Sequence, residues 1–346
     1  INSISRGDLN IALLNKAEGF SNIELHFNCT CTGVRLPEAE AFFEDADGNA
    51  FSVQGEVVIG TDGAGSALRS SMEKDLPGFV TTTDFLDHGY KELNLPPGPG
   101  NSFLIEKNAL HIWPRKSYML IALPNLAGDF TLTLFLAHKG AENSFEALQN
   151  GPQLQAFFRQ NFPDVAELLP DLEEQFFGNP TGALGTVKCY PWQAYGKCLL
   201  LGDAAHAVVP FYGQGMNCSF EDVVVFDELL EQYGDNWEQV FTACEQSRKI
   251  NADAIADLAV DNFYEMRDAT ANPVFQRKRK LETLLEQTFP AYFSKYSMVT
   301  FREDMPYKQA MDKGRAQDAV LMNICREQED VSALNLEEVL AKLSVL

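Results

Sequence analysis

Apolar positions in the first part of the chain follow the two-residue spacing of strands. Residues 23–34 alternate in this way, and two shorter apolar runs flank Asp47-Gly48, which is a turn signal for a β-hairpin. A continuous apolar strand is predicted at 56–60, and it runs into the Gly-rich turn 61–66 and then a helix. The order strand, Gly-rich turn and helix is typical of nucleotide-binding sites in α/β proteins.

Residues 80–140 have a different character, because their short apolar runs are separated by Pro, Gly and Asn turns. This pattern predicts an antiparallel sheet inserted into the chain. Helical spacing follows at 144–148 and at 152–161. The strands of the inserted sheet are predicted at 90–93, 102–105, 110–113, 118–123 and 130–135.

Strand signals return at 183–189 and 198–201, and the rest of the chain has helical spacing. The fold class is therefore α/β, with an inserted antiparallel β-sheet and a helical C-terminal region. The helices predicted in that region and just before it are 220–233, 236–267, 273–287, 307–327 and 334–343. The parts of the chain are expected to be 1–79, 80–180, 181–235 and 236–346.

The charge of the chain narrows the classes of partner. There are 49 acidic and 27 basic residues, so the formal net charge is −22. Such a surface repels nucleic acids and anionic membranes, and we expect neither as a partner. A phosphate-bearing cofactor would need a local electropositive pocket, since the protein as a whole repels anions.

The seven cysteines form no CxxC pair, and their number is odd. We therefore expect free thiols and a reducing compartment, the cytoplasm, with Cys29 and Cys31 on one face of a strand. No run approaches the ~20 apolar residues of a membrane span, so no membrane anchor is expected in this chain. No His, Cys and carboxylate cluster has the spacing of a metal site.

The strand predicted at 198–201 ends in Gly202-Asp203, where candidate chemistry begins. In open α/β sheets ligands bind beyond the carboxyl ends of strands, and a carboxylate there can accept hydrogen bonds from a polyol. The alternative is that Gly-Asp only turns the chain. The continuation favours a ligand, because Pro210–Asn217 is a Gly-rich loop that opens a helix at about Met216.

Two glycines in that loop, Gly213 and Gly215, let the backbone approach a flat ligand closely. The helix N-terminus presents free N–H groups and about half a positive charge. An isoalloxazine ring carries negative charge when it is reduced, so a helix N-terminus aimed there would stabilise it by about 0.3–2 kcal/mol. The loop therefore indicates a flavin.

These residues resemble those of a known family. The segment Gly202–Asn217 looks like the second FAD motif of the class A flavoprotein monooxygenases, and 56–69 looks like their Asp-Gly motif. The resemblance implies a FAD-binding domain of the glutathione-reductase-like fold, with FAD and NADPH as cofactors. The cofactor-binding residues it implies are Asp203 on the ribityl hydroxyls, Gly215, Met216 and Asn217 at the flavin ring, Asp62 and Arg6 near the FAD, and the Cys31 backbone on the adenine side.

Motifs outside that segment resemble the kynurenine 3-monooxygenases within this family. They lie at 3–10, 88–93, 111–115, 121–125, 253–258, 262–267 and 296–301, and the resemblance runs to about residue 310. The substrate-binding residues it implies are Asn262 and Tyr296 at the amino-acid end of the substrate, and Pro210, Phe211 and Met266 around its aromatic ring.

The reaction implied is hydroxylation of L-kynurenine to 3-hydroxykynurenine. NADPH would reduce the flavin, and O2 would give a flavin hydroperoxide that the substrate ring attacks. No side chain stands out as a general acid or base, and the cofactor supplies the chemistry. His206 has no Ser or Cys nucleophile pattern beside it and is interpreted as structural, and the basic run 277–280 as a solvated helix face.

Three features leave alternatives open. The chain opens at Ile1 without the family's GxGxxG fingerprint for the FAD pyrophosphate, so a front section is expected upstream. Position 212 carries Tyr where the family tends to carry Phe or His. Asn262 and Tyr296 could be an exposed helix amide and a core phenol. The alternatives are a hydroxylase of another anthranilate- or phenol-like aromatic, and a non-catalytic truncated remnant.

Overall fold

The computed structural model describes residues 6–266 and 272–345. The chain divides into two compact units. The first unit comprises residues 1–29 and 85–184, and the second comprises 30–84 and 185–346. Each unit is therefore built from two separate stretches of sequence, because residues 85–184 are inserted into the chain of the second unit.

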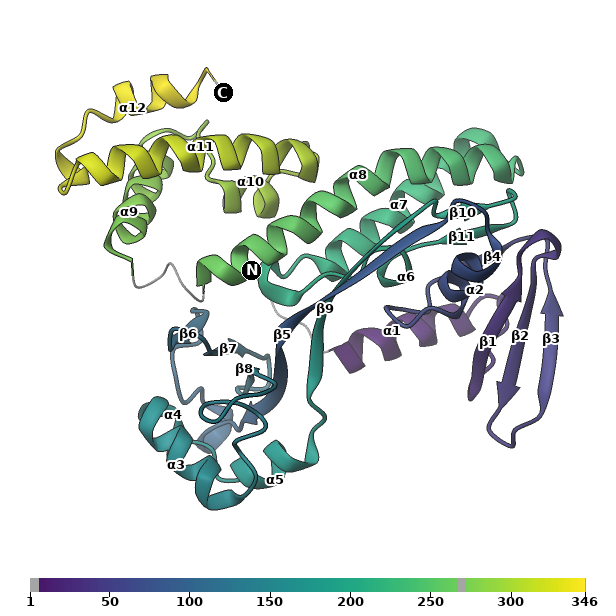
Figure 1. Ribbon diagram of the computed structural model, residues 1–346, viewed down its shortest axis with the longest axis horizontal. Coiled ribbons are helices and arrows are strands. Elements are labelled where there is room, and N and C mark those ends of the chain that lie inside the picture. The colour runs from purple at the N-terminus through teal and green to yellow at the C-terminus, as the bar shows by residue number, and fades with distance from the viewer. Residues whose placement is uncertain (1–5, 267–271, 346) are drawn as a thin grey trace. The chain divides into compact units, whose positions relative to one another are not determined.

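The first unit is centred on an antiparallel sheet with the strand order β6-β7-β8-β5-β9. Every second side chain of β8 from Phe130 to Leu136 is buried on one face, so the sheet turns this face inward, and Phe135 on the opposite face is also buried. Short helices lie against this part of the chain (Figure 1) and share an apolar core with the sheet that includes Phe158 and Phe162. The elements are α1 (Arg6–Glu18), β5 (Val80–Leu95), η2 (Pro99–Asn101), β6 (His111–Pro114), β7 (Met119–Pro124), β8 (Phe130–Ala137), α3 (Gly151–Asn161), α4 (Pro163–Ala166), α5 (Leu172–Gly178) and β9 (Gly182–Tyr190).

Two predictions in this unit are wrong. Residues 102–105 form no strand, because Phe103 and Ile105 pack from a loop against the core of the sheet. Residues 144–148 form no helix, because Phe145 N donates its hydrogen bond to Ala137 O at the end of β8. In both segments the apolar side chains attach a loop to the core, and they do not form one face of a helix or strand.

The second unit contains two small sheets. One has the order β1-β2-β3, and β2 and β3 form the predicted hairpin, with Phe43 opposite Phe51. The other has the order β10-β11-β4, in which β4 and β11 are parallel. The elements are β1 (Cys29–Arg35), η1 (Leu36–Glu38), β2 (Glu40–Asp45), β3 (Ala50–Gln54), β4 (Val58–Gly60), α2 (Ala67–Asp75), β10 (Gln193–Ala194) and β11 (Cys198–Leu200).

The strand predicted at 23–34 is much shorter in the structure. β1 begins only at Cys29, and the preceding residues have no regular structure, with Ile23 and Phe27 exposed. The alternation of apolar residues at 23–28 therefore does not produce a strand, because no partner strand in the described part of the chain lies beside this segment. Cys29 and Cys31 do lie on the same face of β1.

Helices make up the rest of the second unit. The long helices α7 and α8 lie along each other, joined by a turn at Gly234 (Figure 1). α9, α11 and α12 enclose a separate apolar core that includes Leu281, Leu321 and Val339. The elements are α6 (Asp203–His206), η3 (Pro210–Tyr212), α7 (Gly215–Tyr233), α8 (Trp237–Tyr264), α9 (Pro273–Thr288), α10 (Lys295–Phe301), α11 (Tyr307–Glu327), η5 (Val331–Ala333) and α12 (Leu336–Leu343).

Two further properties bear on the expectations drawn from composition. All seven cysteines are free thiols. Among residues 6–266 and 272–345, no helix combines the length and the apolar content that crossing a bilayer requires.

Candidate functional site

Two parallel strands bring the candidate cofactor residues to one edge of a sheet. β4 and β11 pair with Ile59 opposite Leu199. Asp62 follows the last residue of β4 by two positions, and Asp203 follows the last residue of β11 by three. Because the carboxyl ends of neighbouring parallel strands meet at one edge, both carboxylates lie where open α/β sheets bind ligands.

Arg69 holds the two turns together. Its guanidinium, on α2, donates to Ala204 O at 2.7 Å through Nη1 and also donates to Ala64 O. The Arg69 side chain is buried, and a hydrogen bond from a charged donor contributes about 1.5–3 kcal/mol. The spacing between the turn after β4 and the turn after β11 is thereby fixed by one side chain.

Asp62 caps the helix that follows it. Its Oδ2 accepts a hydrogen bond from Ala67 N at 2.7 Å, while the side chain remains exposed. Cys31 lies within electrostatic range of Asp62: burial raises the pKa of the Cys31 thiol, and the negative charge of Asp62 adds to the rise. Cys31 is the third residue of β1.

The turn after β11 depends on a glycine. Gly202 has φ 59° and ψ −144°, a backbone region that is essentially open to glycine alone. Its N–H donates to Asp222 Oδ2 on α7 at 3.1 Å. The turn is thereby tied to α7, and Asp203 begins α6 with an exposed carboxylate that has no partner among the described residues.

A buried ion-pair network supports this turn from behind. His206 Nε2 lies 2.5 Å from Asp222 Oδ2, and Arg248 Nε donates to Asp222 Oδ1 at 2.7 Å. Burial alone would raise the pKa of Asp222, but the bonds to His206 and Arg248 hold it below its ordinary value. The His206 ring also stacks on Trp192, with ring centroids 5.1 Å apart. His206 thus lies in a structural network, in line with its interpretation from the sequence.

Ligand atoms of His206, Cys218 and Asp222 lie within 4.8 Å of one another, which raises the question of a metal site. Arg248 argues against a metal site, because its guanidinium contacts Asp222 and also lies 3.6 Å from Cys218 Sγ. A metal cation there would meet an already bound positive charge and would lose the pairing of Arg248. In the part of the chain that the structure describes, this cluster is an ion-pair network.

The loop predicted to face a flavin leads into an uncapped helix N-terminus. Gly213 has φ 67°, and α7 begins at Gly215, one residue before the predicted position. No side chain caps the first turn of α7, and Met216 is 47% exposed. The Asn217 amide donates to Gln214 Oε1 at 2.9 Å. Open N–H groups at the start of a long helix, together with the unpartnered Asp203 carboxylate, fit the negative and polyol groups of FAD.

The residues predicted to bind substrate come together around η3. Asn262 Nδ2 on α8 donates to Phe211 O at 2.6 Å and lies 3.5 Å from Met266 Sδ. Pro210 begins the same short 3-10 turn as Phe211. Tyr296 on α10 joins this cluster through Tyr212, whose ring stacks on it with centroids 5.6 Å apart.

Arg6 is a predicted cofactor-binding residue whose contacts the structure does not describe. It is the first residue of α1, in the first unit, and its side chain lies outside the described residues. Its role near the FAD therefore stays a prediction.

Sequence reasoning missed the residues that support the site. Asp222 and Arg248 belong to the network behind Gly202, and Tyr212 carries the contact to Tyr296. One signal was present: Cys218 and Asp222 are four residues apart, so they share one helix face, and a buried carboxylate on such a face requires partners. The partners themselves lie 16 and 26 residues away in sequence, where no local pattern points to them.

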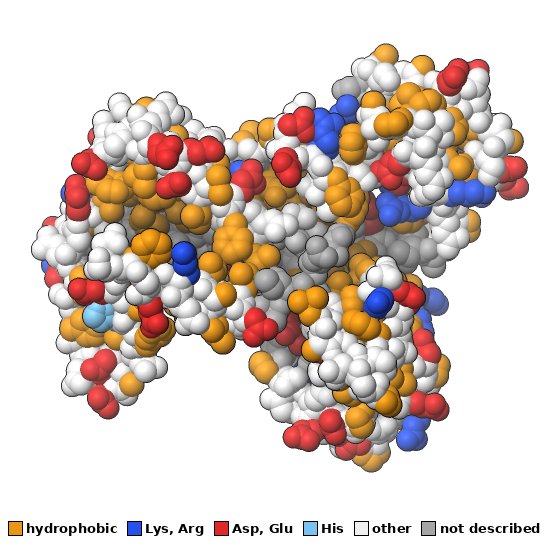
Figure 2. Space-filling view, turned by 180° about the vertical axis from the view of Figure 1, so that it is seen from behind, with side chains coloured by type: hydrophobic (Ala, Val, Ile, Leu, Met, Phe, Trp, Pro, Cys, Tyr) orange, Lys and Arg blue, Asp and Glu red, His pale blue; other side chains and the backbone are white. Residues whose placement is uncertain are grey.

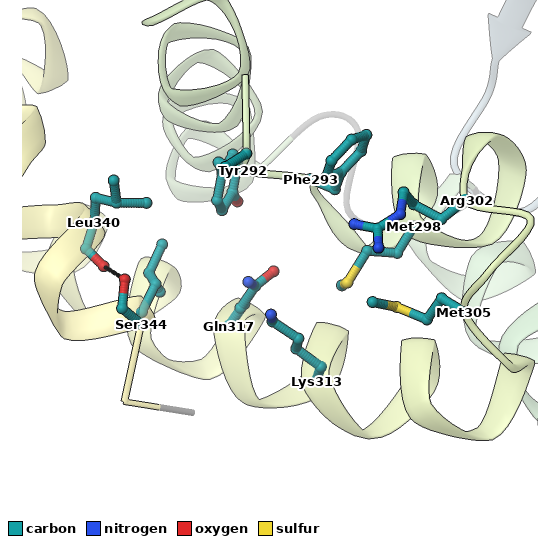
Figure 3. Close-up of a pocket in the computed structure, with 11 residues that line it drawn as sticks. Tyr292, Phe293, Met298, Arg302, Met305, Lys313, Gln317, Leu340 and Ser344 are labelled. Atoms are coloured by element: carbon teal, nitrogen blue, oxygen red, sulfur yellow. Dashed lines mark hydrogen bonds between the residues drawn. The ribbon is translucent and has the colours of Figure 1, made fainter. Parts of the chain in front are cut away.

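A separate small cavity of about 70 Å³ lies among the C-terminal helices (Figure 3). It is lined by Met298 and Arg302 from the α10 region and by Lys313 and Gln317 from α11. None of the predicted site residues lines it. Met298 and Tyr296 are two residues apart on α10, about 200° around a helix, so this cavity lies on the other face of α10 from Tyr296.

Comparisons with known proteins agree with this geometry. The family described as "FAD binding domain" matches residues 184–257. The chain is 51% identical over 326 residues to the kynurenine 3-monooxygenase of Myxococcus xanthus (strain DK1622), a match that covers 94% of this chain and 69% of that protein. It is 40% identical over 346 residues to the kynurenine 3-monooxygenase of Legionella pneumophila (strain Corby), covering 100% of this chain and 76% of that protein.

Solved structures show the same fold at lower sequence identity. A tetrameric form of 2-methyl-3-hydroxypyridine-5-carboxylic acid oxygenase has a TM-score of 0.63 and 21% identity, covering 78% of this chain and 69% of that one. Klebsiella pneumoniae HpxO complexed with FAD and uric acid has a TM-score of 0.60 and 17% identity, covering 93% of this chain and 71% of that one. The fold class predicted from the sequence, α/β with a FAD-binding domain, is confirmed.

Proposed function

The chain belongs to the kynurenine 3-monooxygenase family, and from this premise we propose that it hydroxylates L-kynurenine to 3-hydroxykynurenine with NADPH and O2. Its cofactors are FAD and NADPH. The observation that carries the proposal is 51% identity to a named kynurenine 3-monooxygenase over 94% of the chain.

FAD, when bound, supplies the redox and oxygen-transfer chemistry, so the side chains have to bind, orient and exclude water. We assign the ribityl hydroxyls to the Asp203 carboxylate, which has no partner among the described residues. We assign the flavin ring to the start of α7 at Gly215, Met216 and Asn217. The open N–H groups there favour negative charge by about 0.3–2 kcal/mol, which compensates locally for the acidity of the chain.

We assign the substrate to the cluster around η3. Phe211 and Met266 are both bonded to Asn262, Phe211 through its backbone carbonyl and Met266 through its sulfur, and an aromatic ring and a thioether suit an aromatic substrate. An amide has two N–H donors and one acceptor oxygen. The Asn262 Nδ2 amino group donates to Phe211 O and to Met266 Sδ, so the amide oxygen remains to accept a hydrogen bond from the amino-acid end of the substrate, together with the Tyr296 hydroxyl.

We also propose a cytoplasmic location. The support is the chemistry of the thiols: all seven cysteines are free, and burial raises the pKa of Cys189, Cys198, Cys218 and Cys244 to about 12. Thiols held in this protonated form suit a reducing compartment. We expect small-molecule partners only, because a net charge of −22 disfavours nucleic acids.

The test uses the full-length protein with bound flavin, which absorbs near ~450 nm when oxidised. NADPH oxidation is measured with and without L-kynurenine, and the product is identified by mass and by its position of hydroxylation. We expect kynurenine to stimulate NADPH oxidation and to gain one oxygen at C3. If another anthranilate- or phenol-like aromatic stimulates NADPH oxidation and kynurenine does not, that compound is the substrate, and the reaction is still an aromatic hydroxylation. A folded protein without flavin absorbance would contradict the proposal that it is a flavin-dependent enzyme.

A further inference from the structure

A nearly buried charge network lies beside the proposed substrate cluster. Lys278, Glu282 and Lys295 are 2%, 3% and 7% exposed, so the interpretation of the basic run 277–280 as a solvated helix face is wrong for Lys278. Asp318 lies between the two lysines, with its Oδ1 2.5 Å from Lys278 Nζ and its Oδ2 2.7 Å from Lys295 Nζ. Lys295 also pairs with Glu265, and Lys278 lies 3.3 Å from Glu282 Oε1. Both lysines therefore have two carboxylate partners each.

The network joins four helical segments that are separated in the sequence. Lys278 and Glu282 are on α9, Lys295 begins α10, and Asp318 is on α11. Glu265 directly follows α8 and precedes Met266 of the substrate cluster. Burial lowers the pKa of Lys295, but the carboxylates of Asp318 and Glu265 raise it by more. The pKa is therefore above its ordinary value, and the charged form is favoured. Lys295 is therefore a fixed positive charge at the start of α10.

Gly314 on α11 makes room for this lysine. A Cβ atom at position 314 would lie 2.5 Å from Lys295 Cγ, 2.7 Å from its Cβ and 3.1 Å from its Cα. A change of side-chain rotamer moves Cγ, but it cannot move Cβ or Cα. Any residue larger than glycine at 314 therefore displaces the start of α10 itself.

The position of α10 decides where Tyr296 lies. Tyr296 is the next residue after Lys295, and its ring stacks on Tyr212 beside Phe211. We propose that Gly314 and the Lys295–Asp318 ion pair are positioning elements for substrate binding, which hold Tyr296 against Tyr212 so that its hydroxyl reaches the substrate. The inference rests on the proposed function, since it assigns Tyr296 to the substrate.

The decisive variant is Gly314→Ala in the full-length flavoprotein. Alanine favours a helix more than glycine does, so α11 should form at least as readily as before. We expect the KM for L-kynurenine, and its Kd from the change in flavin absorbance, to rise about tenfold, as the loss of a hydrogen bond would cause. We expect flavin content and the KM for NADPH to stay close to those of the unchanged protein, and the Tm to fall by several degrees, since overpacking a buried contact is destabilising.

Two further variants complete the test. Gly178→Ala adds the same methyl group at the end of α5, where nothing lies within 4 Å, and should change none of these quantities. Asp318→Asn keeps the shape of the side chain but removes its charge, and should raise the KM for kynurenine in the same direction as Gly314→Ala.

Each outcome decides the inference. An unchanged kynurenine KM and Kd in Gly314→Ala would overturn it, and so would a parallel loss of Tm and flavin content, which would show a purely structural role. Failure of the proposed function looks different: the unchanged protein would then bind no kynurenine and show no kynurenine-stimulated NADPH oxidation. That result would remove both proposals, whereas weaker kynurenine binding with unchanged flavin content supports both.

Discussion

Asn262 is the residue on which most of the proposed substrate site depends. Its amide joins η3 to α8, because it bonds Phe211 O and lies next to Met266 Sδ. An amide in an apolar setting needs partners for all its donors and acceptors. The amide oxygen, which neither of these bonds uses, is therefore the group that we propose to recognise the polar end of the substrate.

We predict that Asn262→Ala and Tyr296→Phe each raise the KM for L-kynurenine about tenfold, since each removes hydrogen bonds of about 0.5–1.5 kcal/mol. Flavin content, measured by absorbance of the purified protein, should stay unchanged, because neither residue contacts the turns at Asp62 or Asp203 in the described structure. Asn251→Ala, on the same helix, is the matched control, because Asn251 bonds Ser247 O and Lys308 N and none of the residues proposed to bind the substrate. Loss of flavin in both site variants would show that their assignment to the substrate is wrong.

At the scale of elements, the turn after β11 is held by helices that lie far along the chain. Asp222 on α7 receives hydrogen bonds from Gly202 N, His206 and Arg248, the last of which is on α8. Three donors converge on one carboxylate that is 0% exposed. The cofactor turn, α7 and α8 therefore form one cooperative arrangement.

We predict that Asp222→Asn destabilises the protein by about 3 kcal/mol, because the amide NH2 faces a donor and Arg248 loses its buried counter-charge. Denaturant unfolding measures the loss, and FAD affinity should fall with it. Asp257→Asn, at the half-buried Lys188 ion pair near the surface, should cost less than about 1 kcal/mol. Equal losses in the two variants would contradict a special role for Asp222.

The same carboxylate sets a pH dependence. The folded-state pKa of Asp222 is lowered, so its contribution to stability is present above its ordinary value of 3.8 and is lost as pH falls through the lowered pKa. Asp222→Asn should therefore reduce the stability difference between neutral pH and pH values below about 4.

On the scale of the whole molecule, the dominant property is negative charge. Acidic side chains are spread over the face seen in Figure 2, with hydrophobic patches between them. At a net charge of −22 the surface opposes the approach of anionic NADPH, although the start of α7 offers a local positive field. Salt weakens both interactions, but weaker repulsion would lower the KM for NADPH, whereas weaker attraction would raise it. The salt dependence of this KM therefore shows which of the two dominates.

We predict that the KM for NADPH falls at least about twofold as ionic strength rises from about 0.01 to 0.15 M, where the Debye length shortens from about 30 to 8 Å. Steady-state kinetics at saturating kynurenine measure this, with sodium chloride as the salt. A KM that rises with salt would show that local attraction outweighs the charge of the whole surface.

Many of the helices and turns of this protein could be predicted from the local sequence. The helices of the C-terminal region, the hairpin at Asp47-Gly48 and the helix start near Met216 follow from side-chain spacing and from turn residues, whose effects act over a few positions. The flavin motif is local for the same reason, because Gly202, Asp203 and Gly215 lie within one short segment that must adopt one backbone path.

Only the tertiary structure decided which distant residues support those segments. Asp222 and Arg248 behind Gly202, Arg69 between two turns, and Gly314 against Lys295 are pairings between helices far apart in the sequence. Their physical cause is burial, since a buried charge must find a counter-charge wherever the fold supplies one, and a close helix contact requires the residue without a Cβ. The turn that we propose to bind the flavin follows from the local sequence, while the residues that hold it and the proposed substrate cluster in place follow only from packing.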